Sequence, residues 1–191
     1  LIGVRRWLYA TGVFEQTRLP VPVIVVGNVY VGGTGKTPLV IWLATHLQRQ
    51  GFVPGVISRG HGRHAAQVQE IHAAMSADEA GDEPLLIIQQ AQVPLFVGRD
   101  RVAAARALLR AHPEVNLIIA DDGLQHYALG RDIEILLSDE RGMGNGWLLP
   151  AGPLREPASR HCDFRVLHGV QAADEHAVTM RLHGQQAEQL I

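Results

Sequence analysis

Residues 32–37 read Gly32-Gly33-Thr34-Gly35-Lys36-Thr37, and this stretch decides the fold. It follows an apolar run over residues 21–26 and precedes residues 38–50, where leucines recur at helical spacing. A strand, a glycine-rich loop and a helix in this order are the context that a phosphate-binding loop requires. The glycines let backbone N–H groups approach phosphate oxygens, and the helix N-terminus adds partial positive charge. The sequence therefore predicts a site for a nucleoside triphosphate.

Two side chains of this loop have predicted roles in phosphate chemistry. Lys36 is expected to reach the β- and γ-phosphates of ATP, and the Thr37 hydroxyl is expected to ligate Mg²⁺. Tyr30 stands where the usual pattern begins with glycine, which predicts a loop whose first turn is made differently. A chance match in a surface loop is the alternative, and the flanking strand and helix disfavour it. The predicted nucleotide-binding residues of the loop are Tyr30, Val31, Gly32, Gly33, Thr34, Gly35, Lys36 and Thr37.

The composition limits the class of protein. The 191 residues suffice for about one domain, and a hydrophobic fraction of 47% suffices for a core. With 17 basic and 19 acidic residues the net charge is −2, so no global field attracts the chain to nucleic acid. The single cysteine, Cys162, excludes an internal disulfide. No uninterrupted apolar run reaches the ~18 residues that a membrane span needs.

The alternation of strand and helix patterns predicts the architecture. Apolar runs typical of buried strands alternate with helical patterns, and the candidate functional residues follow the ends of strands. We therefore expect an α/β fold, a P-loop NTPase-like, mostly parallel sheet flanked by helices, with its ligand crevice at the carboxyl edge of the strands. The predicted strands span 21–26, 52–57, 67–71, 93–97, 116–120, 133–137, 164–167 and 177–182, and the predicted helices span 38–50, 81–90 and 102–111.

An acidic pair ends one of the predicted buried strands. Residues 116–120 are almost wholly apolar, and Asp121 and Asp122 follow them directly. A strand that ends in aspartate, downstream of a phosphate-binding loop, is the expected Mg²⁺ side of such a site. We predict that Asp121 or Asp122 binds the metal, directly or through water, together with Thr37. A simple Asp-Gly turn at Gly123 is the alternative.

Two further segments carry candidate anion-binding arginines. Residues 58–63 place two arginines and two glycines just past a strand end, which suits an anion clamp and equally suits a solvated turn. Arg155 lies in the proline-rich stretch 148–157 and is predicted to face phosphate. The ten histidines show none of the spacings typical of zinc sites.

The first 20 residues mix aromatic and basic side chains. Trp7, Leu8 and Phe14 occur there together with three arginines, a combination that suits a membrane interface. The alternative is a helix packed on the core with its arginines in solvent.

Taken in order, the motifs of this chain resemble those of the tetraacyldisaccharide 4′-kinases, the lipid A 4′-kinases of Gram-negative bacteria. Many ATPases share the phosphate loop, whereas the stretches DDGLQH at 121–126 and LLPAGPLREP at 148–157 are far more specific. The remaining segments that carry the resemblance are 26–38, 58–60 and 81–84. The loop with Tyr30 is similar to the loop of this family.

The resemblance implies a lipid kinase that uses ATP and Mg²⁺. Such an enzyme transfers the γ-phosphoryl group to the 4′-hydroxyl of a tetraacyldisaccharide 1-phosphate, the lipid A precursor. The resemblance implies that Asp82 is the base for this hydroxyl, and that Asp121 and Asp122 serve Mg²⁺ and the phosphates. The implied catalytic residues are Asp82, Lys36, Asp122 and His126, and the implied nucleotide site also includes Gln125 and Arg155.

The resemblance also implies a place in the cell and a domain plan. The family works at the cytoplasmic face of the inner membrane and is anchored by an N-terminal hydrophobic helix. Residues 1–20 are then a membrane-proximal amphipathic segment, 21–170 the kinase core and 171–191 the start of a C-terminal lobe. In this family that lobe closes over ATP and supplies a histidine near the base. The sequence is therefore expected to be a fragment of such a kinase, with the lipid surface as a partner and no nucleic-acid or protein partner.

Two other kinds of protein share parts of this pattern. A P-loop GTPase or ATPase of the metal-insertion or regulatory type begins with the same strand, loop and helix, but the chain lacks the Asn-Lys-x-Asp element of guanine-specific proteins. A nucleotide-binding interaction module without catalysis would not need Asp82 beside a second anion site.

Overall fold

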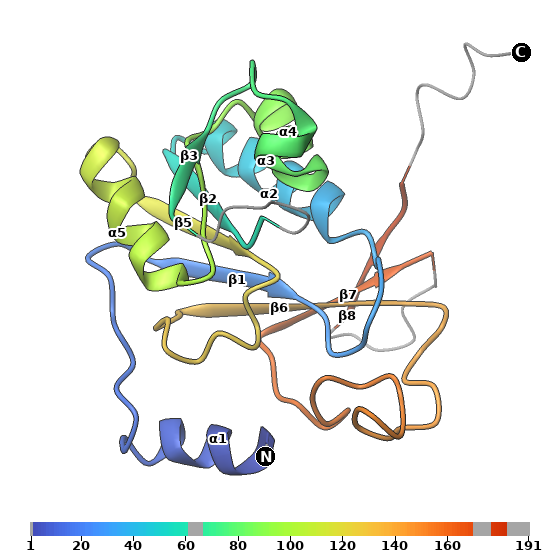
Figure 1. The fold of residues 1–191 in the computed structure, drawn as a ribbon. Coiled ribbons are helices and arrows are strands. Elements are labelled where there is room, and N and C mark those ends of the chain that lie inside the picture. Colours follow the sequence, from blue (N-terminus) through green and yellow to red (C-terminus); the bar gives the residue numbers. More distant parts are fainter. Residues whose placement is uncertain (1, 61–66, 170–176, 183–191) are drawn as a thin grey trace, which may run out of the picture.

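Eight strands form one sheet in the computed structural model, which describes residues 2–60, 67–169 and 177–182 (Figure 1). The strand order is β3-β4-β2-β5-β1-β6-β7-β8, and every neighbouring pair is parallel except β3 with β4. The strands are β1 (Val23–Gly27), β2 (Pro54–Ser58), β3 (Gln69–Ile71), β4 (Leu95–Val97), β5 (Leu117–Asp121), β6 (Ile133–Asp139), β7 (Phe164–His168) and β8 (Ala177–Met180).

The strand β1 occupies the centre of the sheet, between β5 and β6. Its register pairs Val26 with Asp121 and Gly27 with Leu136, so the carboxyl ends of the three strands meet at one edge. Every residue of β1 and β5 is buried, as expected for parallel strands covered on both faces. This edge therefore receives both the loop that follows β1 and the aspartate that ends β5.

Helices cover both faces of the sheet. Ile24 and Val26 of β1 pack with α2 and α4, whereas Val23 and Val25 pack with α5, because alternate residues of a strand point to opposite faces. One short apolar strand thus contributes to two cores. The helices are α1 (Ile2–Ala10), α2 (Lys36–Arg49), α3 (Ala77–Ala80), α4 (Asp82–Ala91) and α5 (Arg101–Ala111).

Local signals explain where the helices begin. The Asp100 carboxylate accepts a hydrogen bond from Ala103 N at 3.0 Å and caps α5. The helix α2 begins after Gly35, whose φ of 86° lies in the left-handed region that favours glycine. The sequence analysis missed α3, which begins with a capping box between Ser76 and Glu79. Four residues are too few to leave a periodic apolar pattern.

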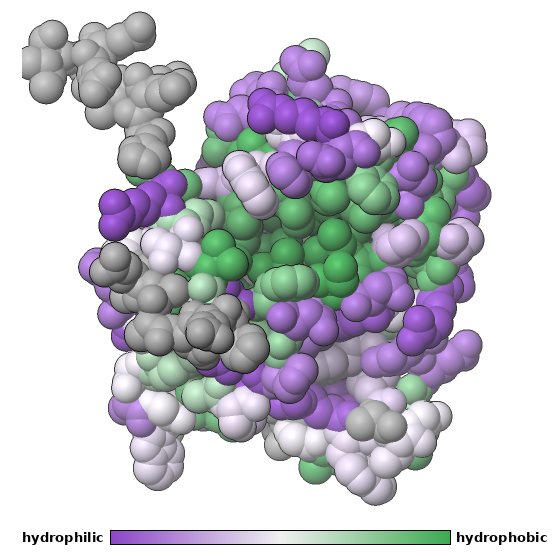
Figure 2. Space-filling view, turned by 180° about the vertical axis from the view of Figure 1, so that it is seen from behind, coloured by the Kyte–Doolittle hydropathy of each residue, from purple (hydrophilic) through white to green (hydrophobic). Residues whose placement is uncertain are grey.

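The predicted mostly parallel α/β sheet with flanking helices is confirmed. The edge strand β3 is the exception, since it pairs with β4 in the antiparallel direction. The strand β8 extends the sheet beyond β7, with Leu167 paired to Thr179. The face of the sheet beside β7 and β8 is open: an apolar groove of about 740 Å³ lies between α2 and these strands, and Figure 2 shows it as the central green area.

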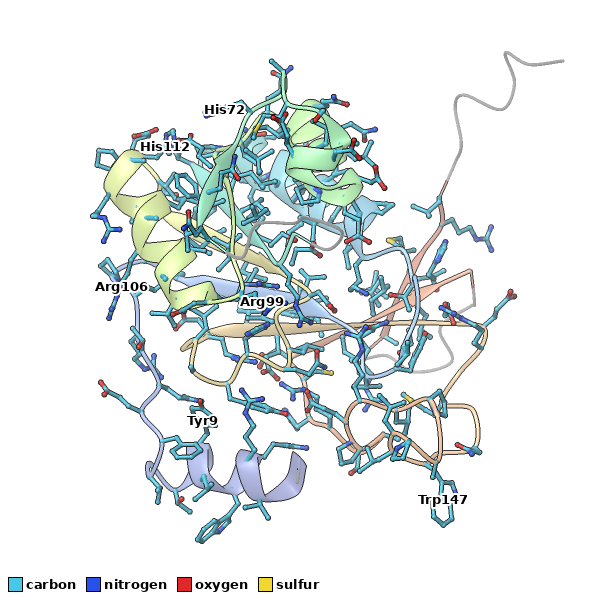
Figure 3. All side chains as sticks on the ribbon, viewed as in Figure 1. Tyr9, His72, Arg99, Arg106, His112 and Trp147 are labelled. Carbon is cyan, nitrogen blue, oxygen red and sulfur yellow. The ribbon has the colours of Figure 1, made fainter. Side chains whose placement is uncertain are left out.

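The helix α1 lies below the sheet in Figure 1 and contacts the body through aromatic side chains. The ring centroids of Tyr9 and Tyr127 are 5.7 Å apart, and Figure 3 shows Tyr9 pointing from α1 toward the body. The Arg5 guanidinium lies 5.5 Å from the Tyr127 centroid, and Arg6 lines a cavity of about 220 Å³ beside it. These arginines therefore turn toward the protein, while Trp7 is exposed. Within the described ranges no helix has the length and apolarity to cross a bilayer.

Candidate nucleotide-binding site

The phosphate loop, residues 28–35, joins β1 to α2 at the carboxyl edge of the sheet. The buried Asn28 side chain holds this loop together. Its Nδ2 donates to Gly32 O at 3.3 Å and to Thr34 Oγ1 at 3.4 Å, and its Oδ1 accepts from Lys36 Nζ at 3.4 Å. The loop is therefore ordered around a residue that the sequence analysis did not predict as part of the site.

Tyr30 and Val31 make the unusual first turn of the loop. The Tyr30 side chain is buried, and its hydroxyl oxygen accepts a hydrogen bond from Asp139 N at 2.7 Å. Burial raises the pKa of Tyr30 to about 12. Val31 N donates to Pro153 O at 3.0 Å, which occupies this N–H within the protein. The structure thus uses Tyr30 as a core residue beneath the loop.

Arg141 lies over the loop, although no motif identified it in the sequence. Its Nη2 donates to Gly33 O, and its guanidinium is 5.4 Å from the Tyr30 ring centroid. Arg141 Nε donates to the Asp139 carboxylate, at 3.1 Å to Oδ1 and 2.9 Å to Oδ2. A Cβ on Gly32 would lie 2.9 Å from Arg141 Nη1, and the φ of 115° at this residue also requires glycine.

A cavity of about 470 Å³ opens beside the loop. It brings three loop residues next to a guanidinium, so backbone N–H donors and a cation line the same space. These are the groups that bind phosphate oxygens. The lining residues are Gly33, Thr34, Gly35, Asp139, Glu140, Arg141, His168, Gly169 and Leu182.

Two predicted residues from two other segments, Lys36 and Arg155, converge on Asp122. Lys36 Nζ lies 3.6 Å from Asp122 Oδ1, and Arg155 Nη1 lies 3.1 Å from Asp122 Oδ2. Asp122 has a φ of 48°, a left-handed conformation that aspartate tolerates better than most residues. This turn separates Asp122 from the strand and directs its carboxylate toward both cations. The carboxylate neutralises the two groups that are predicted to face phosphate.

Asp121 has different surroundings. It is buried, and its Oδ2 accepts a hydrogen bond from Ser58 Oγ at 3.0 Å. Its Oδ1 is also buried and has no hydrogen-bond partner among the described residues. Burial raises the pKa of Asp121 from 3.8 to about 6, the negative charge of Glu83 contributes to the rise, and the Ser58 hydrogen bond opposes it. The two adjacent aspartates therefore differ in burial and partners.

The pKa of Asp121 predicts how stability depends on pH. Because this pKa is higher in the folded state than in the unfolded chain, the folded state binds the Asp121 proton more tightly. The stability that this proton gives to the folded state is lost as pH rises from about 4 to about 6. The loss amounts to roughly 3 kcal/mol in the free energy of unfolding. Asp121→Asn removes the titrating carboxyl and with it this loss of stability. The variant should therefore be more stable than the parent at neutral pH.

Urea unfolding over this pH range measures the difference between variant and parent. Asp78→Asn changes an exposed carboxylate on α3 and serves as the control. His126 also titrates, since burial lowers its pKa to about 4, but it does so in both proteins and cancels in the difference. A difference that is flat between about pH 4 and about pH 7 would contradict the assignment.

The loop end of the sheet has the oxygen ligands that Mg²⁺ requires. Thr37 is buried at the start of α2 and carries a hydroxyl, and Asp121 offers its Oδ1, which has no hydrogen-bond partner among the described residues. No three His, Cys, Asp or Glu side chains of the described residues cluster to hold a metal by themselves. Mg²⁺ commonly takes one or two carboxylates and completes its shell with phosphate oxygens and water. Thr37, Asp121 and Asp122 therefore fit Mg²⁺ in chemistry, and their binding of the metal stays a prediction.

Asp82 is the first residue of α4 and is exposed. Gly81 occupies the N-cap position, and no side chain caps this helix, so Asp82 makes no capping hydrogen bond. The negative charge of the neighbouring Glu83 raises the pKa of Asp121. The N-terminal end of α4 therefore lies near the site.

Gln125 and His126 follow the acidic pair, and the Gln125 side chain contacts the phosphate loop. Gln125 Nε2 donates to Asn28 O at 3.2 Å and to Glu156 Oε1 at 3.1 Å. Glu156 is buried and also accepts from Arg160 Nη1, so an ionic network fixes the residue that holds the loop. Burial lowers the pKa of His126 to about 4, with help from the charges of Arg101 and Arg59. His126 is therefore neutral at neutral pH.

Arg101 is a further residue that sequence reasoning missed. It is the first residue of α5 and is buried, and its Nε and Nη2 have no partner among the described residues. Burial lowers its pKa to about 10, while Asp121 and Asp122 favour its charge. A lone arginine after a helix cap carries no sequence signal for this placement. The predicted anion clamp at residues 58–63 lies partly outside the described residues, since 61–66 are not among them.

Comparisons with known proteins agree with this geometry. Residues 1–190 match the protein family described as tetraacyldisaccharide-1-P 4′-kinase, LpxK. The tetraacyldisaccharide 4′-kinase of Janthinobacterium sp. (strain Marseille) is 57% identical over 193 residues, which cover 100% of this chain and 56% of that protein. The enzyme of the same name from Azoarcus sp. (strain BH72) is 53% identical over 191 residues, with coverages of 96% and 56%.

A solved structure shares the fold. The LpxK of Aquifex aeolicus, crystallised in complex with ATP, superposes with a TM-score of 0.80 at 34% identity. The match covers 94% of this chain and 59% of that chain. The chain thus spans a little over half the length of the relatives that it matches.

Proposed function

Because the chain belongs to the tetraacyldisaccharide-1-P 4′-kinase family, we propose that it forms the ATP-binding core of a lipid kinase. The enzyme transfers the γ-phosphoryl group of ATP to the 4′-hydroxyl of a tetraacyldisaccharide 1-phosphate in lipid A biosynthesis. The observation that carries the proposal is the convergence of Lys36 and Arg155 on Asp122 beside the ordered phosphate loop. Phosphoryl transfer depends mainly on such positioning and charge neutralisation.

The residues of this chain divide the work on ATP. Backbone N–H groups of the glycine-rich loop and the start of α2 hold phosphate oxygens. When phosphate enters, Lys36 and Arg155 exchange part of their contact with Asp122 for the phosphates. Bound Mg²⁺ supplies further neutralisation of phosphate charge, and Thr37 with Asp121 or Asp122 holds it. Asp82, at the exposed start of α4, accepts the proton of the sugar hydroxyl.

The proposed acceptor is a lipid, which places the protein at a membrane. We assign it to the cytoplasmic face of the inner membrane, with residues 1–20 next to the lipid. Residues 21–170 form the kinase core, and within residues 171–191, the expected start of a second lobe, β8 still pairs with β7 of the core sheet. No nucleic-acid or protein partner is needed for this activity.

A chimaera tests the activity. Residues 1–191 replace the matching part of the Janthinobacterium relative, and transfer of labelled γ-phosphate to tetraacyldisaccharide 1-phosphate is measured. We expect the chimaera to transfer phosphate and the 191-residue chain alone to do so poorly, because the rest of the relative supplies the second lobe. Substituting GTP for ATP tests the alternative of a GTPase. A chimaera that hydrolyses ATP without labelling the lipid would refute the kinase assignment.

The metal assignment has its own prediction. Asp121→Asn and Asp122→Asn should each raise the Mg²⁺ concentration needed for half-maximal ATP binding, because each removes a charged oxygen ligand. We expect a shift of at least about tenfold in one of them, equivalent to about 1.4 kcal/mol. Calorimetric titration of ATP into the 191-residue chain at several Mg²⁺ concentrations measures it, with Asp78→Asn as the control. Unchanged metal dependence in both variants would remove these aspartates from the site.

A further inference from the structure

The cavity of about 220 Å³ between α1 and the body of the protein is lined by three arginines from three segments. Arg6 belongs to α1, Arg131 to the segment between β5 and β6, and Arg160 to the connection between β6 and β7. We call this space the arginine cavity. Figure 3 shows Tyr9, which also lines it, pointing from α1 toward the body. The other lining residues are Gln16, Tyr127, Glu134 and His161.

Positive charge exceeds negative charge in the lining of the arginine cavity. Its one carboxylate is that of Glu134, which lies 2.9 Å from Arg131 Nη1 and also pairs with Arg160 Nη2. Three guanidinium groups and one carboxylate leave a surplus of two positive charges when His161 is neutral. A surplus of this kind favours an anion that carries two negative charges.

Two of the three arginines have N–H groups left for a ligand. Arg160 is 4% exposed, and its Nη atoms donate to Glu134 and Glu156, but its buried Nε has no hydrogen-bond partner among the described residues. Arg6 makes no hydrogen bond or ion pair within the described part of the chain. Arg131, in contrast, uses all three of its nitrogens in hydrogen bonds and contributes charge alone. A buried donor without a partner is costly, so the Arg160 Nε calls for an acceptor.

The Tyr127 ring gathers further positive charge at this cavity. The guanidinium of Arg5 lies 5.5 Å from the ring centroid, and those of Arg131 and Arg160 lie 5.8 Å from it. Attraction to the ring offsets only part of the repulsion between like charges at such separations. The charge of Arg5 matches that of the buried Glu156 behind Arg160, so the surplus of the lining persists.

The arginine cavity is separate from the cavity beside the phosphate loop. The two cavities share no lining residue. Glu134, near the start of β6, lines the arginine cavity, whereas Asp139, the last residue of β6, lines the cavity beside the loop. Five residues of a strand span about 17 Å. An anion in the arginine cavity therefore does not occupy the nucleotide site.

We propose that the arginine cavity binds a phosphate group, as inorganic phosphate or as a phosphate monoester, between α1 and the body. Guanidinium groups match the geometry of phosphate oxygens, and a phosphate dianion matches the surplus charge. A water molecule needs about 10–15 Å³ of cavity, so a volume of about 220 Å³ has room for phosphate. The bound anion joins Arg6 to Arg160 and fastens α1 to the body. The proposal does not depend on the proposed kinase function.

Calorimetric titration of inorganic phosphate into the 191-residue chain tests the site. A non-hydrolysable ATP analogue with Mg²⁺ first fills the phosphate loop, and chloride keeps the ionic strength constant, because salt screens exposed arginines. Arg6→Gln should weaken phosphate affinity about five- to tenfold by removing one charged donor, and Arg6→Lys should restore most of it. The control is Arg106→Gln, which changes an exposed arginine of α5 and should bind like the parent. Equal affinity of Arg6→Gln and the parent, or binding to neither, would refute the proposal.

Hydrogen exchange shows where the phosphate binds. With phosphate at about ten times its dissociation constant, exchange through opening of α1 should slow about tenfold in the parent and much less in Arg6→Gln. Binding that leaves the amides of α1 unprotected would place the phosphate elsewhere and overturn the proposal.

Two soluble phosphate monoesters identify the source of the phosphate group. Tighter binding of glucosamine 1-phosphate than of inorganic phosphate indicates a sugar phosphate, and tighter binding of glycerol 3-phosphate indicates a lipid headgroup. Weaker binding of both indicates the free ion. Each of these results supports the site only if Arg6→Gln weakens the tightest ligand, and an unchanged affinity in that variant counts against it.

Discussion

Replacing Lys36 with alanine is expected to weaken ATP binding by about ten- to a hundredfold. Lys36 Nζ lies 3.4 Å from Asn28 Oδ1 and 3.6 Å from Asp122 Oδ1. These contacts hold the ammonium between the phosphate loop and Asp122. Its contact with phosphate is a hydrogen bond between charged groups, which contributes about 1.5–3 kcal/mol. Calorimetric titration of ATP into the 191-residue chain measures the loss.

Two features of the chain make this experiment specific. Arg49→Ala removes the same charge from the far end of α2 and should leave ATP affinity unchanged. Lys36 is the only lysine of the 191 residues, so an amine reagent can modify just this side chain and the α-amino group. ATP should protect Lys36 from the reagent. If Lys36→Ala bound ATP like the parent, or if ATP gave no protection, the phosphate-loop assignment would be wrong.

Asp82→Asn should lower the turnover of the chimaera by about 10²–10⁴-fold while ATP affinity stays within about twofold. A general base acts on the acceptor hydroxyl in the transition state, so its loss affects the rate and not the binding of the nucleotide. The exposed Asp82 makes no capping hydrogen bond, so the amide should also leave the free energy of unfolding nearly unchanged. Initial rates at saturating ATP and lipid measure the effect.

The control for Asp82 is Asp78→Asn, which neutralises another exposed carboxylate near the same helix and should keep the parent rate. Near-normal turnover of Asp82→Asn would show that this carboxylate only complements the helix dipole.

Contiguous residues encode much of this protein. The strand before residue 32, the glycines and the helix after residue 35 are neighbours in the chain, so apolar periodicity and glycine chemistry identify them without tertiary information. The run that ends at Asp121 is equally local. For the same reason the mostly parallel sheet and the predicted metal side of the site follow from sequence patterns alone. The antiparallel direction of β3 does not, because three residues carry no directional signal.

The partners of these residues were decided by the fold alone. Ser58 and Asp121 are 63 positions apart, and Arg141 and Gly33 are 108 apart, so their contacts exist only because the strand register brings two loops to one edge. No sequence pattern predicted that the two adjacent aspartates have different surroundings. Asp121 is buried beside Ser58. The φ of 48° at Asp122 turns its carboxylate toward Lys36 and Arg155.

The placement of three other side chains likewise needed the tertiary structure. Arg101 directly precedes the predicted helix 102–111, Tyr30 stands where the usual loop pattern has glycine, and Trp147 directly precedes the stretch 148–157. Packing buries Arg101, places Tyr30 beneath the phosphate loop and leaves Trp147 exposed. Local sequence specifies which elements form, because backbone propensities act over a few residues. Burial and charge pairing depend on distances between distant segments, and only the assembled sheet sets those distances.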